Sequence, residues 1–166
     1  MRIPFFCAAM ITSFPPLVWE EPRLLLLGSM PGIQSLQREQ YYAHPQNQFW
    51  RILATAFGHD LPVTYGEKRD LLRRNRIALW DVLAYCEREG SLDSAIKNAL
   101  PNDIQAFVER FPTLQKIGFN GQQSFKYFER SFGALVDLPT VVLPSTSPAY
   151  TIPFERKLEP WKNFLL

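Results

Sequence analysis

The chain has 166 residues, a length that suits one domain with a substantial buried core. Hydrophobic residues make up 46% and charged residues 20%, an ordinary globular composition that does not indicate disorder. The formal net charge of +2 is too small to demonstrate a nucleic-acid partner, although it allows a local basic face. No apolar run reaches the ~20 residues that a membrane-spanning helix needs, so no membrane partner is expected.

The two cysteines and the start of the chain bear on the cellular setting. Cys7 and Cys86 suggest neither a disulfide framework nor a zinc site, so a reducing, intracellular setting fits best. The start makes a poor signal peptide, because its apolar stretch is short and is broken by a proline. Met10 could equally be the true start, which would make residues 1–9 an extension of a single domain over residues 10–166.

The first half of the chain alternates extended and helical patterns. Residues 13–22 predict an extended arm stiffened by proline, and residues 23–28 form an apolar run that ends at a glycine, as in a strand covered on both faces. Apolar residues at helical spacing predict a helix over residues 45–58, which also ends at a glycine. A charged amphipathic helix over residues 65–76 and a second buried strand over residues 77–83 follow.

The second half continues this alternation. A helix is predicted over residues 102–112, with Asn102 as its N-cap and a proline as its stop. A third strand follows over residues 114–119, and a helix over residues 121–132 comes next.

The chain closes with a fourth strand and a last helix. The strand covers residues 140–144, and the helix covers residues 154–166 and should be bent or interrupted at Pro160. Helices that alternate with short apolar strands are typical of an α/β fold, in which helices cover both faces of a parallel sheet.

Four segments directly follow the predicted strands and are rich in small, polar or aromatic residues. Their sequences are GSMPG, WDVLAYC, FNGQQS and PSTSPAY. Ligands in such sheets bind beyond the carboxyl ends of the strands, so we expect the site here. The first segment lacks the Lys-Ser/Thr ending of a P-loop and does not fit the dinucleotide fingerprint.

Other chemistries fit these loops poorly. A hydrolase would use Ser29 as nucleophile and His44 as base, but no G-x-S-x-G elbow surrounds Ser29, and His44 could equally brace its loop. No metal site is predicted, because His44 and His59 are the only histidines and no carboxylate lies at ligand spacing near either.

The segment GSMPGIQSLQREQYYAHPQNQFW resembles the first motif region of the hypoxanthine-DNA glycosylases, also called DNA-deoxyinosine glycosylases, of the uracil-DNA glycosylase superfamily. The resemblance continues through IALWDVLAYCEREGSLDSAI, GFNGQQSF and LPSTSPA, and covers nearly the whole chain from Met10. It implies a three-layer αβα fold around a four-stranded parallel sheet. It also implies that the chain excises hypoxanthine from DNA without a metal or organic cofactor, with uracil and xanthine as further candidate bases.

The same resemblance sets expectations for partners and location. The partner would be DNA that contains deaminated bases, and a glycosylase of this size can work as a monomer. We expect a cytoplasmic, bacterial-type protein that associates with the nucleoid through DNA. Two alternatives stay open: a glycosylase directed mainly at uracil, and a catalytically inactive module that binds damaged DNA. The intact HPQN segment favours an active enzyme.

Asn47 is the candidate catalytic residue. Excision needs a water aimed at the anomeric carbon and stabilisation of the departing base, which carries negative charge. Most of the superfamily carries Asn or Asp in the third position of the first loop to handle this water, but Met30 stands there and cannot hold it. The resemblance implies that Asn47 of the His-Pro-x-Asn segment acts instead, since an amide can accept from a water and also donate. Judged from the sequence alone, Asn47 could also begin the following helix.

Three further residues are candidates for binding the base. By resemblance, Tyr42 would stack on its face, although it could instead line the core. Asp81 could accept from N1–H of hypoxanthine or N3–H of uracil, or could form a salt bridge or an N-cap. Asn120 could read the base or cap the helix over residues 121–132, with the cap favoured. The first loop would complete the pocket with Gly28, Ser29 and Met30.

The segment PSTSPAY resembles the second motif of the superfamily, a loop that grips DNA near the flipped nucleotide. Ser145 stands where many relatives have His or Asn, and its hydroxyl can donate but cannot carry positive charge. Tyr150 or Ile152 could fill the vacated space in the duplex, while a plain surface loop is the alternative. The expected DNA-binding residues are Ser145, Thr146, Ser147, Pro148 and His44.

Overall fold

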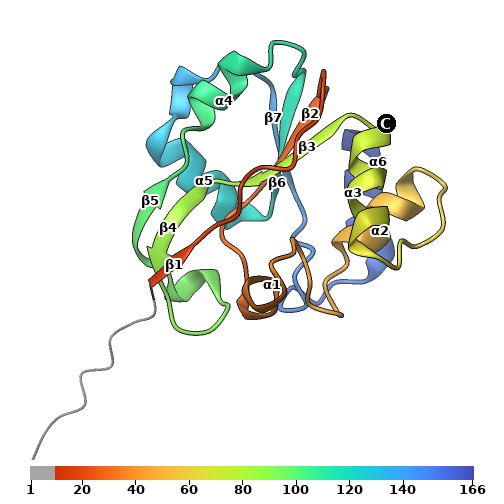
Figure 1. Ribbon diagram of the computed structural model, residues 1–166, viewed down its shortest axis with the longest axis horizontal. Coiled ribbons are helices and arrows are strands. Elements are labelled where there is room, and N and C mark those ends of the chain that lie inside the picture. The colour runs from red at the N-terminus through yellow and green to blue at the C-terminus, as the bar shows by residue number, and fades with distance from the viewer. Residues whose placement is uncertain (1–9) are drawn as a thin grey trace, which may run out of the picture.

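The computed structural model describes residues 10–166, so Cys7 and the expected extension lie outside the described residues. At its centre is a parallel sheet with the strand order β3-β2-β6-β7 (Figure 1). Its strands are β2 (Leu24–Gly28), β3 (Ile77–Asp81), β6 (Lys116–Asn120) and β7 (Thr140–Leu143). The four predicted strands and their parallel sheet are confirmed, with small shifts at the ends.

Helices cover both faces of the sheet, as predicted. They are α2 (Phe49–Ala56), α3 (Tyr65–Arg74) and α6 (Phe154–Leu165) on one face, and α4 (Ile104–Arg110) and α5 (Gln122–Ser131) on the other (Figure 1). Leu24 and Leu26 pack into the cluster with α2, α3 and α6, whereas Leu25 and Leu27 pack into the cluster with α4 and α5. Side chains alternate between the faces of a strand, so one run of four leucines fills both layers.

A second sheet was not predicted. It is antiparallel, has the order β1-β4-β5, and consists of β1 (Met10–Thr12), β4 (Leu83–Glu87) and β5 (Lys97–Pro101). The predicted strand over residues 77–83 ran from β3 into the start of β4 without a break. Most β5 side chains are exposed, so this strand leaves no apolar run in the sequence.

Short helical segments were missed as well. They are α1 (Ile33–Arg38) and the single-turn helices η1 (Asp93–Ala95) and η2 (Gly133–Leu135). The arm over residues 13–22 forms neither helix nor named strand, and a single bridge joins Leu17 to Leu79.

One local prediction was wrong. Asp103, not Asn102, caps α4, because its carboxylate accepts from the Ala106 amide at 3.0 Å. The Asn102 amide instead donates to the carbonyls of Asp81 (2.9 Å) and Leu83 (3.2 Å), and so braces the turn from β3 into β4. Pro160 was expected to bend or interrupt the last helix, and α6 is not interrupted there but runs as one helix from Phe154 to Leu165.

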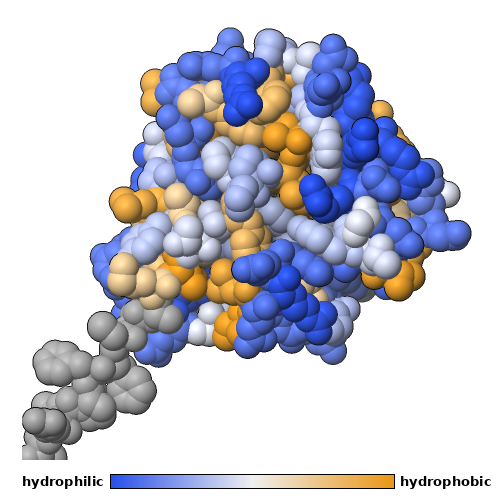
Figure 2. Space-filling model, viewed as in Figure 1, coloured by the Kyte–Doolittle hydropathy of each residue, from blue (hydrophilic) through white to orange (hydrophobic). Residues whose placement is uncertain are grey.

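Across residues 10–166, every helix is too short or too polar to cross a bilayer. Figure 2 shows hydrophilic residues over most of one face of the molecule, with apolar residues along its middle.

The N-cap of α4 gives a direct test of this local correction. We expect Asp103→Ala to lower the free energy of unfolding by about 1 kcal/mol, because the Ala106 amide loses its acceptor. Urea denaturation measures the change. Asp103→Asn, which keeps an acceptor oxygen, is the matched control and should retain most of the stability. Equal stability of the Ala variant and the wild type would contradict the cap.

Candidate active site

A cavity of about 690 Å³ lies at the carboxyl ends of the parallel strands. Gly28, Asp81 and Asn120 are the last residues of β2, β3 and β6, and Ser145 follows β7 by two residues. The cavity is lined by all the residues that were predicted for the site: Gly28, Ser29, Met30, Tyr42, His44, Asn47, Asp81, Asn120, Ser145, Thr146, Ser147 and Pro148. The structure therefore brings the predicted residues together.

Asn47 lines the cavity and is partly buried. Its side-chain carbonyl accepts from the backbone N–H of Phe49 at 3.0 Å, and its backbone N–H donates to the His44 carbonyl at 2.9 Å. Asn47 precedes α2, whose N-cap is Gln48, and its side chain stabilises the entry to that helix while it also borders the cavity. A carbonyl oxygen has a second lone pair, and the bond to Phe49 fixes the direction of the amide.

Tyr42 forms one wall of the cavity. Its ring stacks on Phe49 with the centroids 4.1 Å apart and the planes inclined by 24°. Burial, reinforced by the charge of Asp81, raises the pKa of the Tyr42 hydroxyl, so the group stays neutral. Its buried oxygen makes no hydrogen bond of good geometry with a described residue, although the Asn120 side chain lies close enough to oppose the rise of this pKa. One face of the ring is thus occupied, and only the other could receive a ligand.

Gly28 allows two polar groups to converge on the cavity. A Cβ at this position would lie 2.6 Å from Oδ1 of Asp81 and 2.8 Å from the Tyr42 hydroxyl oxygen. Both distances are shorter than any normal contact, so a larger residue would push Asp81 or Tyr42 away. The glycine was predicted as a pocket residue, and this close approach gives it a specific role.

Asp81 is a buried carboxyl group, only 3% exposed, at the end of β3. Its Oδ2 has no hydrogen-bond partner within residues 10–166. Burial first, and then the charge of Asp93, raise the pKa of Asp81 to about 7, and the charge of Arg88 opposes this rise. The N-cap interpretation of Asp81 was wrong, because β4 rather than a helix follows it.

Asn120 does not cap α5, which corrects the favoured interpretation. The N-cap is Gly121, at a φ of +94°. The Asn120 amide instead makes two hydrogen bonds with the fully buried Thr146: its nitrogen donates to the Thr146 hydroxyl, and its oxygen accepts from the Thr146 N–H, both at 2.9 Å. The Thr146 carbonyl in turn accepts from the Gln48 amide at 3.1 Å. These bonds tie the ends of β6 and β7 to the start of α2.

The loop after β7 is held by its own hydroxyls. Ser145 accepts from the Ser147 amide, and Ser147 accepts from the Ala149 amide, both at 3.2 Å. Lys157, which is only 2% exposed, donates to the Ser147 carbonyl at 3.4 Å. Tyr150 stands at the rim with 45% of its surface exposed.

The first loop does not support the hydrolase alternative. The Ser29 hydroxyl donates to Oδ1 of Asp93 at 2.7 Å, while Nδ1 of His44 accepts from the Gln46 amide at 3.1 Å. Met30 packs into the apolar cluster with α4 and α5 and also lines the cavity. Within residues 10–166, no group of three or more His, Cys, Asp or Glu side chains is placed to hold a metal ion.

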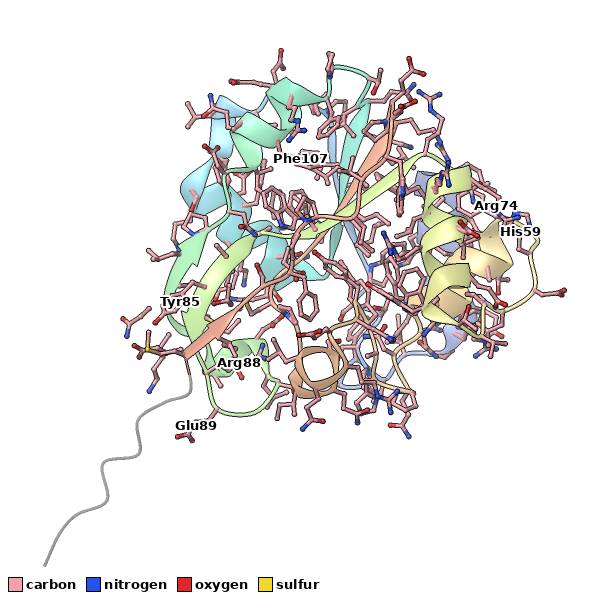
Figure 3. All side chains as sticks on the ribbon, in the orientation of Figure 1. His59, Arg74, Tyr85, Arg88, Glu89 and Phe107 are labelled. Atoms are coloured by element: carbon pink, nitrogen blue, oxygen red, sulfur yellow. The ribbon has the colours of Figure 1, made fainter. Side chains whose placement is uncertain are left out.

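The segment between β4 and β5 was missed as part of the site. Ser91, Leu92, Asp93 and Ser94 all line the cavity. Arg88 is buried behind them, where it donates to the carbonyls of Gly90 and Pro31. Figure 3 shows Arg88 between β4 and α1, whereas Glu89 extends outward. The polar residues of EREGSLDS could have indicated a site. They were passed over because the site was expected directly after the strands of the parallel sheet, and this segment follows none of them.

The chain is similar to known proteins over nearly all of its length. Residues 15–165 match the family model described as the uracil DNA glycosylase superfamily. A protein named hypoxanthine DNA glycosylase from Methanosarcina barkeri is 41% identical over 116 residues, which are 69% of this chain and 73% of that protein. A protein of the same name from Methanosarcina acetivorans is 40% identical over 138 residues, which are 82% of this chain and 86% of that protein.

A solved structure agrees with these matches. A uracil DNA glycosylase-like protein from Methanosarcina acetivorans, solved by solution NMR, superposes with a TM-score of 0.83 at 34% identity. The match covers 95% of this chain and 97% of that one, which confirms the predicted fold class. Both curated relatives are archaeal, so they give no support to the expected bacterial-type setting.

The buried carboxyl of Asp81 gives a testable pH dependence of stability. Between about pH 4 and about pH 7 the unfolded chain releases this proton while the folded chain keeps it, so wild-type stability should fall as the pH rises. Asp81→Asn removes this contribution. The free energy of unfolding of the variant minus that of the wild type should therefore rise by up to about 1.4 kcal/mol for each pH unit in this window. Denaturant titrations at several pH values measure the difference, and a difference that does not change with pH would contradict the assigned environment.

Proposed function

Because this chain belongs to the uracil DNA glycosylase superfamily, as its motifs predicted, we propose that it hydrolyses the N-glycosidic bond of hypoxanthine in DNA. Two relatives at about 40% identity carry the name hypoxanthine DNA glycosylase, and the chain spans most of their length. The observation that carries the proposal is one shared cavity. It is bordered by the amide of Asn47, the ring of Tyr42 and the carboxyl of Asp81, all at the mouth of the sheet.

The target nucleotide must leave the duplex to reach this cavity. The cavity volume of about 690 Å³ falls within the range of small-molecule sites, so a flipped base and a water fit together. Tyr42 offers one ring face to the base because Phe49 covers the other. Asp81, with an unpartnered oxygen, meets the edge of the base.

Asn47 positions the attacking water. Its carbonyl, held by the Phe49 amide, has a lone pair left for the water, and the orientation of the side chain is set before the substrate arrives. A carboxamide is a poor base, so its contribution lies in aiming the water at the anomeric carbon and not in removing a proton. Met30 takes no part in holding water and instead closes the apolar side of the cavity.

The loop after β7 binds the DNA strand. The hydroxyl groups of Ser145 and Ser147 accept from backbone amides, which leaves their protons free for phosphate or base oxygens. His44 and Pro148 border the same cavity, and Tyr150 is exposed at its rim, where it can fill the space that the flipped nucleotide leaves. One chain supplies all these groups, so the site needs no residue from a second subunit.

A base-excision assay tests the function. The protein is incubated with labelled duplexes that contain hypoxanthine, uracil or xanthine, and abasic sites are then cleaved with alkali. We expect the fastest cleavage for hypoxanthine. Faster cleavage of the uracil duplex would instead indicate a uracil-directed enzyme, and tight binding without an abasic product would indicate an inactive damage binder.

The role of Asn47 is tested by substitution. We expect Asn47→Ala to lower the single-turnover rate of excision by roughly 10²-fold or more, by analogy with the loss of one preorganised polar group. Asn47→Ser separates the two roles of the residue, because serine can accept a hydrogen bond at a helix start but cannot replace the amide at the water. The serine variant should remain slow. A rate restored to the wild-type level in that variant would show that Asn47 acts only on the helix.

A further inference from the structure

Asp81 is the cavity residue whose protonation would change the chemistry most. It is almost fully buried, it borders the cavity, and the glycine at position 28 leaves room for its carboxyl group. Its Oδ2 and the Tyr42 hydroxyl are both buried without a hydrogen-bond partner among residues 10–166. Buried polar groups are rarely left unpaired, so these two atoms point to a ligand that completes them.

The charges around Asp81 do not neutralise it. Arg88 is the cation that acts on it, but its Nε and Nη2 donate to the carbonyls of Gly90 and Pro31, and its buried Nη1 bonds neither Asp81 nor any other described residue. Asp93, from the segment before β5, adds a second negative charge and is engaged by Ser29.

The other titratable groups at Asp81 are Tyr41 and Tyr42, whose hydroxyls burial and the charge of Asp81 keep protonated. No group that faces Asp81 within the described residues therefore bonds it as a cation. An ionised carboxylate here would be a buried charge without a bonded partner, which is costly.

The reaction makes ionisation at this place more costly still. As the C1′–N9 bond of deoxyinosine breaks, its electron pair leaves with the base and spreads over the ring nitrogens and the carbonyl oxygen. A carboxylate beside that oxygen would repel the growing charge, whereas a carboxylic acid can donate a hydrogen bond to it.

We propose that Asp81 carries a proton in the active enzyme and donates it in a hydrogen bond to the carbonyl oxygen of the departing hypoxanthine. The carbonyl of the same acid accepts from the neighbouring N1–H, so one neutral carboxyl group pairs with both atoms on this edge. Water adds to C1′ and the proton that it gives up neutralises the base, while Asp81 keeps its own proton. This inference rests on the proposed function and specifies how the cavity stabilises the leaving group.

The pH range of the effect follows from the surroundings of Asp81. Its pKa of about 7, raised mainly by burial, means that about half of the molecules hold the proton at that pH. The active fraction should fall above this pH. A permanently neutral side chain should not lose activity in this way.

The test compares the pH dependence of wild type and Asp81→Asn. Single-turnover excision is measured on a hypoxanthine duplex from about pH 5.5 to pH 9. The ratio of the variant rate to the wild-type rate should rise about tenfold per pH unit above about pH 7, whatever its value at low pH. Any effect of His44, which lines the same cavity, is common to both proteins and cancels in the ratio.

A ratio that stays constant or falls with pH would overturn the proposal while the proposed function stands. Absence of excision by the wild type at every pH would reject the proposed function itself, and the proposal with it. The two failures are therefore distinguishable in one experiment.

A second variant keeps the test decisive if Asp81→Asn does not fold. In Asp93→Asn the carboxyl group of Asp81 remains, and an oxygen that can accept from Ser29 is kept. Loss of the Asp93 charge eases the ionisation of Asp81, so the decline of the rate should move to lower pH. A midpoint that stays in place, with an unchanged thermal unfolding profile, would contradict the role of Asp81.

Discussion

The parallel alignment of four strands is the constraint on which the site depends. In a parallel sheet every strand ends at the same edge, so the loops after β2, β3, β6 and β7 meet there whatever their distance along the chain. Fully buried leucines in β2 hold this sheet between two helical layers, because they alternate between the clusters on its faces. The apolar layers are thus what fixes the polar groups at the edge.

At that edge, hydrogen bonds divide the polar residues into two kinds. Asn120 and Thr146 bond to each other, and Thr146 also bonds to the start of α2, so these residues order the site, and the Asn120 amide keeps one donor and one acceptor position beyond these bonds. Tyr42 and Asp81 retain buried atoms without a partner in the described chain. A folded protein keeps such unsatisfied groups at a cost in stability, and a substrate that completes them would recover it. The division explains why Asp81 is a stronger candidate than Asn120 for contact with the base.

The sequence predicted the parts of the fold that apolar periodicity controls. The four central strands and the five long helices produced clear patterns, and the loop residues after the strands then followed from the rule for parallel sheets. The antiparallel sheet was missed because β5 is mostly exposed and β4 continues from β3 with only one residue between them. Asp93 and Arg88 were missed for the same reason, since their place beside Asp81 depends on the path of that sheet. The predicted N-cap of α4 was wrong by one residue. Asn and Asp are both favourable N-cap residues, and only the backbone conformation decides between Asn102 and Asp103.

Met30 and Asn47 are the two residues that decide where the attacking water could be held. The motif implied that the usual water-binding position was lost, and the structure places the Met30 side chain in an apolar cluster at the edge of the cavity. Asn47 lies just before a different element, α2, and its side-chain carbonyl is fixed by the N–H of Phe49, the first residue of that helix.

The most direct measurement is a structure of the protein bound to a duplex that carries a 2′-fluorinated deoxyinosine, whose N-glycosidic bond resists cleavage. The account requires the base to lie flipped in the cavity, with its face on Tyr42, its N1 and carbonyl edge at Asp81, and a water between Asn47 and the anomeric carbon. A base that stays stacked in the duplex, or that turns its sugar away from Asn47, would contradict it.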